Sequence, residues 1–216
     1  MREIALKAAI ALVICLTMAF IALPIASLFL KNSPDAVLRS MNDPAVKDAL
    51  RLSLTTSTLT TLIVILMGTP VAYVNARFSY FGKEMEDSLI DLPVIMPPAV
   101  AGIALLMAFG RMGIVGQHLN ALGFSIAFTT LAVIFAQVFV SSPFYIRQAR
   151  TSFEDVDLSF ENAARTLGAS RIYAFFHVTL PMAMNGLISG AIMAFARSLG
   201  EFGATIMFAG NFQGRT

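Results

Sequence analysis

The sequence predicts an all-α protein that crosses a membrane several times, and three observations predict this fold class. Of the 216 residues, 57% are hydrophobic and 13% are charged, a far more apolar composition than soluble domains have. The mean hydropathy is +0.76. The apolar residues gather in windows of roughly 20 residues, the length that a helix needs to cross a bilayer. We therefore expect one membrane-embedded domain over residues 1–216. It should be built from helices, because lipid offers no hydrogen-bond partners to the N–H and C=O groups of irregular backbone.

Five windows are expected to span the membrane, and short charged stretches separate them. They are Ala8–Leu30, Leu52–Ala76, Leu92–Gly110, Phe124–Ile146 and Met182–Phe208. The first window follows basic residues, as the core of a signal peptide does, but it is longer than such a core and more spans follow it. We interpret it as a retained helix, with a cleavable signal as the alternative.

Prolines and a carboxylate mark the start of the third span. Pro93, Pro97 and Pro98 are expected to kink or break the helix there, because proline lacks an N–H and clashes with the preceding turn. A broken entry of this kind often lines a cavity, since its exposed backbone groups need water or protein partners. Asp91, just before the prolines, is interpreted as a helix cap or a solvated carboxylate.

Small residues follow one face of the fifth span. Gly186, Gly190 and Ala194 recur every four residues, and Ser198 extends the row. This spacing favours close approach of another helix rather than a stripe of residues that lines a pore. The hydroxyl-rich run 'SLTTSTLTT' in the second span likewise favours hydrogen bonds between packed helices, with an aqueous path as the alternative.

Two charges stand one helical turn apart near the end of the fifth span. Arg197 and Glu201 are expected to pair, because pairing lowers the cost of holding either charge in the membrane. Two interpretations stay open. Arg197 can contact an anion transiently on a path through the membrane, or it can merely neutralise Glu201 and fix the helix against a neighbour.

Enzymatic and nucleic-acid-binding functions are not expected. Cys15 is the single cysteine, so no internal disulfide or cysteine-based metal site can form. His118 and His177 lie far apart, and the sequence has no paired-histidine zinc motif, serine elbow or phosphate loop. The basic residues are scattered along the loops rather than gathered in a stripe. We therefore expect no catalytic residue, no metal and no cofactor.

The longest polar interruption in the second half of the chain is 'ENAARTLGASRIYAFFHVTLP', which predicts a helix-turn-helix elbow. Ser159–Leu167 suits a short helix, Gly168 suits a left-handed turn that ends it, and Ser170 suits the cap of a second helix. Pro181 marks the start of the next span. The elbow either docks into a cleft of a partner protein or rests on lipid headgroups as an amphipathic connector.

The order of residues in the elbow resembles the coupling-helix signature of bacterial and archaeal ABC importer permeases. Ala163 and Ala164 are followed after three residues by Gly168, and Leu180–Pro181 closes the motif. Asn162 stands where the family has a glutamate, with Glu161 one place earlier, so an ion pair carried by that acid in the family is in doubt here. Val178 replaces an isoleucine.

The resemblance implies that the elbow lies in the cytoplasm, in a groove of a separate ABC ATPase. It also implies that closure of the ATPase around ATP moves the elbow. The positions that it assigns to ATPase coupling are Glu161, Asn162, Ala163, Ala164, Gly168, Arg171, Leu180 and Pro181. A cytoplasmic elbow also implies a cytoplasmic N-terminus. The count of basic residues gives only a weak signal for this orientation. The implied location is the cytoplasmic (inner) membrane, crossed several times.

A second resemblance concerns the substrate. 'FARSLGEFGATIMFAGN', followed by Gly214, Arg215 and Thr216, is similar to molybdate permeases and more distantly to permeases for tungstate and for sulfate or thiosulfate. 'DLPVIMPPAVAGIALL' and 'GTPVAY' are similar to the same group. The residues that we take as candidates for the translocation path are Arg197, Ser198, Glu201, Pro97 and Pro98.

The expected function is therefore that of a molybdate permease in an ABC importer, with sulfate, thiosulfate or tungstate as alternative substrates. An ATP-independent secondary transporter or channel is the alternative from another class. The implied partners are two copies of an ABC ATPase, a periplasmic or lipid-anchored molybdate-binding protein, a second copy of the chain in a homodimer, and membrane lipid. Members of the resembled group continue through at least one more helix, so we expect a truncated chain that lacks the last one.

Overall fold

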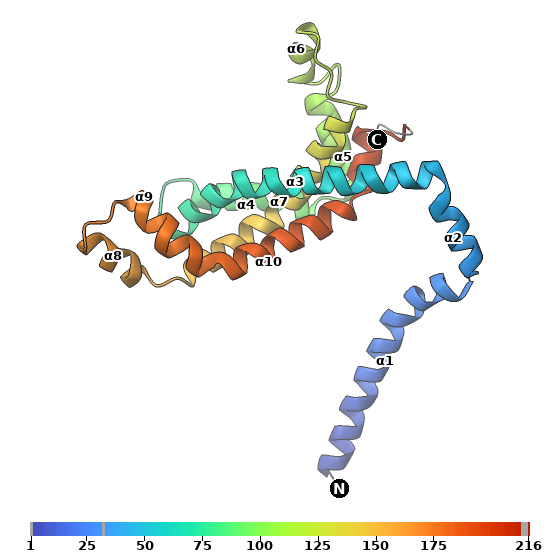
Figure 1. Ribbon diagram of the computed structural model, residues 1–216, viewed down its shortest axis with the longest axis horizontal. Coiled ribbons are helices and arrows are strands. Elements are labelled where there is room, and N and C mark those ends of the chain that lie inside the picture. Colours follow the sequence, from blue (N-terminus) through green and yellow to red (C-terminus); the bar gives the residue numbers. More distant parts are fainter. Residues whose placement is uncertain (1, 32, 213–215) are drawn as a thin grey trace. The chain divides into compact units, whose positions relative to one another are not determined.

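The computed structural model describes residues 2–31, 33–212 and 216, and Figure 1 shows their helices. Gly214 and Arg215 of the second resemblance lie outside the described residues. Within that part, four helices are long and apolar enough to cross a membrane, or five when one bent pair counts as a span. The all-α membrane fold is therefore confirmed. The chain divides into two compact units, Met1–Lys47 and Asp48–Thr216.

The first unit holds an apolar helix and a short polar one. Helix α1 (Arg2–Lys31) is the most apolar of the candidate spans, and its large hydrophobic side chains are exposed, which suits a helix surrounded by lipid. Helix α2 (Pro34–Asn42) begins at a proline, and the Ser33 hydroxyl accepts a hydrogen bond from the Ala36 N–H. A proline in the first turn costs no hydrogen bond, because the first N–H groups of a helix have no partner within it.

The second unit contains three long helices, which are α3 (Pro44–Arg77) from Asp48 onward, α7 (Thr130–Glu154) and α10 (Leu180–Leu199). Helix α10 packs on α7 through its small residues. A Cβ added to Gly186 would lie 1.8 Å from Ser152 Oγ of α7, and one added to Gly190 would lie 3.2 Å from Gln148 Cβ. Ala194 and Ser198 are fully buried. The prediction that this row serves close packing is confirmed.

Hydroxyl groups of α3 bind α7 across the interface. The Thr60 hydroxyl donates to Gln137 Oε1 at 3.0 Å, and Gln137 Nε2 donates to the Ser198 carbonyl of α10 at 3.1 Å. Ser57 is buried beside them. Thr58, on the exposed side, bonds only to a carbonyl of its own helix. The run 'SLTTSTLTT' thus serves packing on the face that meets α7.

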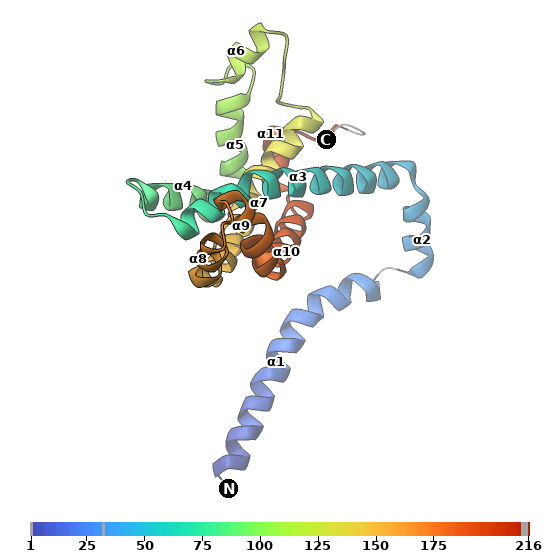
Figure 2. The same cartoon turned by 60° about the vertical axis from the view of Figure 1, so that its left-hand side comes forward.

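The third expected span is broken at Pro97 and Pro98, as predicted, but Pro93 lies inside the helix before the break and does not end it. The chain bends by 118° between helices α4 (Lys83–Ile95) and α5 (Pro98–Phe109), and Figure 2 shows their different directions. Pro97 is extended and Pro98 begins α5, because neither can continue the hydrogen bonding of α4. The interpretation of Asp91 as a helix cap is wrong. It lies inside α4 and forms an ion pair with Arg147 of α7.

Two other spans differ from expectation. Helix α7 begins at Thr130 rather than Phe124, because Gly123 and Phe128 have left-handed backbone (φ +85° and +62°) that a helix cannot contain. The fifth span ends at Leu199, and a separate helix α11 (Gly203–Phe208) follows a short break. The Glu201 carboxylate accepts a hydrogen bond from the Ala204 N–H at 2.7 Å and thereby caps the start of α11. The remaining helix, α6 (Gly116–Ala121), follows α5.

Candidate functional site

The polar elbow forms as predicted. Helices α8 (Leu158–Thr166) and α9 (Arg171–Ala174) are joined at Gly168, whose φ of +93° favours glycine. The Ser170 hydroxyl caps α9 by accepting from the Tyr173 N–H at 3.2 Å. Asp157 caps α8, and the hydrogen bond from the Ser159 N–H lowers the pKa of this carboxyl. The Asp157 carboxyl therefore stays ionised to a lower pH than a free aspartate does.

The chain continues from the elbow into the membrane without a break. A π-helical turn, η1 (Phe175–Thr179), joins α9 to α10 in one candidate span, Arg171–Leu199. The Leu180 N–H bonds to the Phe175 carbonyl five residues back. Pro181 thus stands near the start of α10 but does not begin a new span. The wide turn offers room for a proline ring, which would clash with the carbonyl four residues back in a regular helix.

The residues assigned to coupling divide between two surfaces. Asn162 and Ala163 are exposed on α8, and Ala164 and Gly168 line a hollow of about 490 Å³ between α8 and α9. Leu167, at the tip, is 89% exposed. We call these residues and Arg165 the outer face of the elbow.

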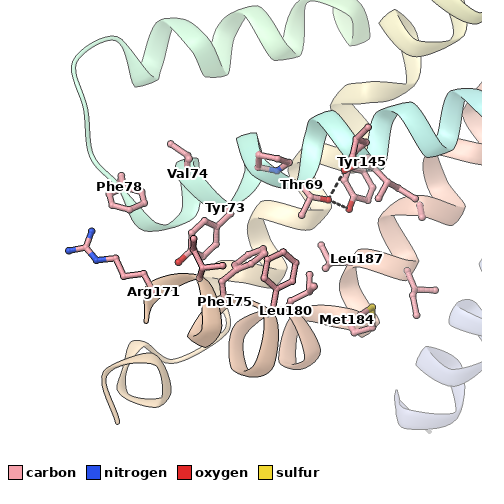
Figure 3. A pocket seen from close by; sticks show the side chains of 17 residues that line it. Thr69, Tyr73, Val74, Phe78, Tyr145, Arg171, Phe175, Leu180, Met184 and Leu187 are labelled. Carbon is pink, nitrogen blue, oxygen red and sulfur yellow. Dashed lines mark hydrogen bonds between the residues drawn. The ribbon is translucent and has the colours of Figure 1, made fainter. Parts of the chain in front are cut away.

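The other assigned residues lie away from the outer face. Arg171 and Leu180 line an apolar groove of about 690 Å³ between α3 and the helix formed by α9, η1 and α10, as Figure 3 shows. Pro181 is exposed on α10. Glu161 points inward. Its Oε1 lies 2.9 Å from Arg77 Nη2 at the end of α3, and the pair is largely buried.

Sequence reasoning missed Arg77 as the partner of Glu161. The signal available in the sequence is an arginine at the end of an apolar span, a position that also suits the negative end of the helix dipole. Such an arginine normally reaches water or lipid headgroups. The structure instead turns it toward the elbow, where it also donates to the Val156 carbonyl at 2.9 Å.

The candidates for the translocation path gather where the two broken spans meet. Pro98 begins α5 and Gly203 begins α11, and a Cβ on Gly203 would lie 2.5 Å from Pro98 Cβ. The predicted ion pair forms, with Arg197 Nη2 2.7 Å from Glu201 Oε2. The Glu201 side chain is 2% exposed and that of Arg197 is 28% exposed. The arginine therefore keeps part of its surface open while the acid is enclosed.

A cavity of about 170 Å³ with both polar and apolar side chains in its lining adjoins this junction. Its lining includes Glu201, Gln137, Ser53, Thr56 and Thr205. Gln137 and Thr205 were not predicted. A lone amide in an apolar span is the signal that points to Gln137. Hydroxyl and amide groups can bind a hydrated or partly hydrated ion weakly, which is what passage requires.

No cluster of His, Cys, Asp and Glu that could hold a metal ion occurs among the described residues. The arrangement consists instead of broken apolar spans beside buried polar groups, and of a polar elbow that continues one candidate span. These features define a membrane-embedded transport component.

Comparison with known proteins gives the family. The family described as "Binding-protein-dependent transport system inner membrane component" matches residues 65–214, and the chain belongs to it. The chain is 42% identical over 197 residues to "Molybdenum transport system permease protein ModB" of Mycobacterium tuberculosis, covering 91% of this chain and 75% of that protein. It is 42% identical over 193 residues to "Molybdate/tungstate transport system permease protein WtpB" of Thermococcus kodakarensis, covering 88% and 73%. ModB of Escherichia coli K12 is 43% identical over 169 residues, covering 78% of this chain and 74% of that protein.

Solved structures share the fold at low sequence identity. A bacterial ABC transporter involved in the import of the acidic polysaccharide alginate matches with a TM-score of 0.72 and 15% identity, covering 92% of this chain and 74% of that chain. A bacterial alginate ABC transporter in complex with its pentasaccharide-bound periplasmic protein matches with a TM-score of 0.66 and 14% identity, covering 95% and 91%. The fold is thus that of an ABC importer permease.

Proposed function

We propose that this chain is the transmembrane permease subunit of an ABC importer that carries molybdate into the cytoplasm. The observation that carries the proposal is the elbow of α8 and α9, present in a chain that is 42% identical to a molybdenum permease along most of its length. The chain supplies the path and the elbow, and a separate ATPase supplies ATP hydrolysis. Relatives described as molybdate/tungstate permeases support tungstate as a second substrate.

The outer face of the elbow is the proposed ATPase-binding surface. Ala163, Ala164 and Gly168 keep that surface narrow enough to enter a cleft, and Leu167 offers an apolar contact. A short helix held rigidly at the end of a span can transmit the motion of one domain to another. In a homodimer, two elbows would meet two ATPase subunits, and a molybdate-binding protein would deliver the anion at the opposite membrane surface.

Ion pairs group the ends of several helices with the elbow. Arg77 at the end of α3 pairs with Glu161 of α8, and Arg150 near the end of α7 pairs with Asp87 of α4 at 2.8 Å. These contacts group the ends of α3 and α7, the start of α4 and the elbow on one side of the membrane. An elbow in the cytoplasm then places the N-terminus there too, because α1 and α3 are successive spans.

The junction of the broken spans is the proposed path. Arg197 offers a positive charge that Glu201 partly neutralises, so an oxyanion would meet a weak and transient site rather than a tight one. Ser198 is fully buried, and its carbonyl accepts a hydrogen bond from Gln137 of α7, so its proposed part is to join the two helices. Pro97 and Pro98 create the break that opens backbone groups to the path.

One substitution tests the docking surface. Gly168→Asp is expected to leave membrane insertion intact and to abolish co-purification of the ATPase, because it adds a charged side chain at a left-handed position of the outer face. Gly123→Asp is the matched control, since Gly123 is also left-handed with open space around it but lies outside the elbow. Normal co-purification with Gly168→Asp would contradict the proposed docking surface.

A further inference from the structure

Helix α8 makes few packing contacts with the other helices that the structure describes. None of its residues is fully buried. Among the residues that the structure describes, Glu161 is the α8 side chain that forms polar bonds to other helices. Without those bonds, the helix would be held by its two connecting loops and by modest contact with η1 and α9.

Glu161 joins two separate elements to the elbow. On one side, its Oε1 lies 2.9 Å from Arg77 Nη2, and the Tyr73 hydroxyl donates to its Oε2 at 3.4 Å. Both partners belong to the last turns of α3. On the other side, the Thr179 hydroxyl of η1 donates to Oε1 at 2.8 Å. We call Glu161, Arg77, Tyr73 and Thr179 the elbow clasp.

The clasp is enclosed and rests on packed rings. The side chains of Arg77 and Glu161 are 6% and 14% exposed, and Thr179 is fully buried. The Tyr73 ring packs against Phe175 of η1 with centroids 4.7 Å apart and against Phe153 of α7 at 5.5 Å. Figure 3 shows Tyr73 and Phe175 close together at the elbow end of the groove. Side chains so surrounded have little freedom, so the clasp holds one geometry.

The charges make the clasp hard to open. A buried ion pair with additional hydrogen bonds is costly to break, because removal of one partner leaves the other charge enclosed without compensation. A displacement of α8 must therefore carry both α3 and η1 with it or leave Arg77 unpaired. Because η1 continues into α10, the displaced segment extends to the Arg197–Glu201 pair beside the path.

We propose that Glu161 is a positioning residue, not an ATPase contact, and that the elbow clasp makes the coupling elbow, α3 and α10 move as one body. This proposal rests on the proposed function. A positioning role also explains why the glutamate stands at Glu161, one residue before Asn162, where the resembled family has its glutamate. Glu161 faces the membrane helices, whereas Asn162 faces outward and remains free to meet the ATPase.

The test compares Glu161→Gln with Glu154→Gln in the complex of permease and ATPase, reconstituted in lipid vesicles. Glu154 is the matched control, because it also pairs with an arginine but is 44% exposed and belongs to α7. We expect Glu161→Gln to retain the ATPase yet hydrolyse at least threefold more ATP for each molybdate transported, while Glu154→Gln matches the parent protein. An unchanged ratio, or loss of the bound ATPase from Glu161→Gln, would overturn the positioning role.

Amide hydrogen exchange provides a readout that does not depend on the substrate. Exchange across residues 158–166 is expected to rise in Glu161→Gln, because α8 loses its attachment. Unchanged exchange there would overturn the clasp. Should Glu161→Gln fail to fold, Thr179→Val removes one bond and should raise exchange less. If the parent protein neither binds an ATPase nor transports molybdate, the proposed function is contradicted. The hydrogen-exchange measurement would then still test the elbow clasp by itself.

Discussion

Gly102→Val should destabilise the junction between the two broken spans. Gly102 of α5 packs against the backbone of α11, where an added Cβ would lie 2.6 Å from the Ala204 carbonyl oxygen and 2.7 Å from Met207 Cβ. Carbon atoms in contact lie about 3.5 Å apart, so the second distance is short by about 0.8 Å. Backbone atoms cannot move aside as the end of a flexible side chain can, so α5 and α11 must separate.

The size of the effect follows from two opposed contributions. Valine gains a few tenths of a kcal/mol over glycine in helix propensity. Overpacking costs about 1–3 kcal/mol, and the rigid partner places this site at the upper end. The net loss of roughly 2–3 kcal/mol corresponds to a folded-to-unfolded ratio lowered by about 30- to 150-fold. The glycine therefore matters for packing far more than for local helix stability.

Equilibrium unfolding in mixed detergent micelles measures this change. Gly200→Val is the matched control, because a Cβ there would meet only the Ala196 carbonyl oxygen at 3.5 Å, an ordinary contact. We expect Gly102→Val to unfold at a clearly lower denaturant concentration, and Gly200→Val to unfold near the midpoint of the parent protein. Equal midpoints for the two variants would refute the close packing of α5 on α11.

Three further predictions follow from the contacts. Arg197→Gln should reduce both folding yield and transport, because it leaves the enclosed Glu201 unpaired, and a second change, Glu201→Gln, should restore folding yield as measured by detergent-extracted protein. Thr60→Val should cost about 0.6 kcal/mol, the average for a hydrogen bond between membrane helices, and a cost of zero in micelle unfolding would show that its bond adds nothing. The hydrogen bond from the Tyr80 hydroxyl to Glu86 raises the pKa of Tyr80 to about 12. This bond therefore stabilises the fold at pH values below the ordinary pKa of tyrosine, and the stabilisation is lost as the pH rises through the raised pKa of the folded protein. Glu86→Gln should therefore lower the titration midpoint of that tyrosine in an ultraviolet pH titration, and an unmoved midpoint would contradict the assigned cause.

Features with a local chemical cause could be predicted from the sequence. The break at Pro97 and Pro98 follows from the missing N–H of proline, and the turn at Gly168 follows from its tolerance of left-handed backbone. The packing row of α10 follows from the helical spacing of small residues, and Gly186 shows it most clearly. Each of these depends on a few neighbouring residues, so a single sequence contains the information.

Features set by contacts far along the chain could not be predicted. The last window has apolar residues on both sides of Arg197 and Glu201, so its hydropathy does not show that α10 ends at Leu199 or that Glu201 caps a new helix. The late start of α7 depends on the left-handed backbone of Phe128, an uncommon state for a bulky residue. The role of Glu161 depends on Arg77 of another span, and no spacing rule links the two.

The most direct test of the central claim is the molybdenum content of cells with and without the gene, grown with trace molybdate and ample sulfate. Import of molybdate by this permease predicts that cells without the gene lose most of their molybdenum and regain it when molybdate is supplied in large excess. Tungsten content, measured in the same cells with trace tungstate, would show whether both anions are carried. Unchanged molybdenum and tungsten in cells without the gene would contradict the proposed function.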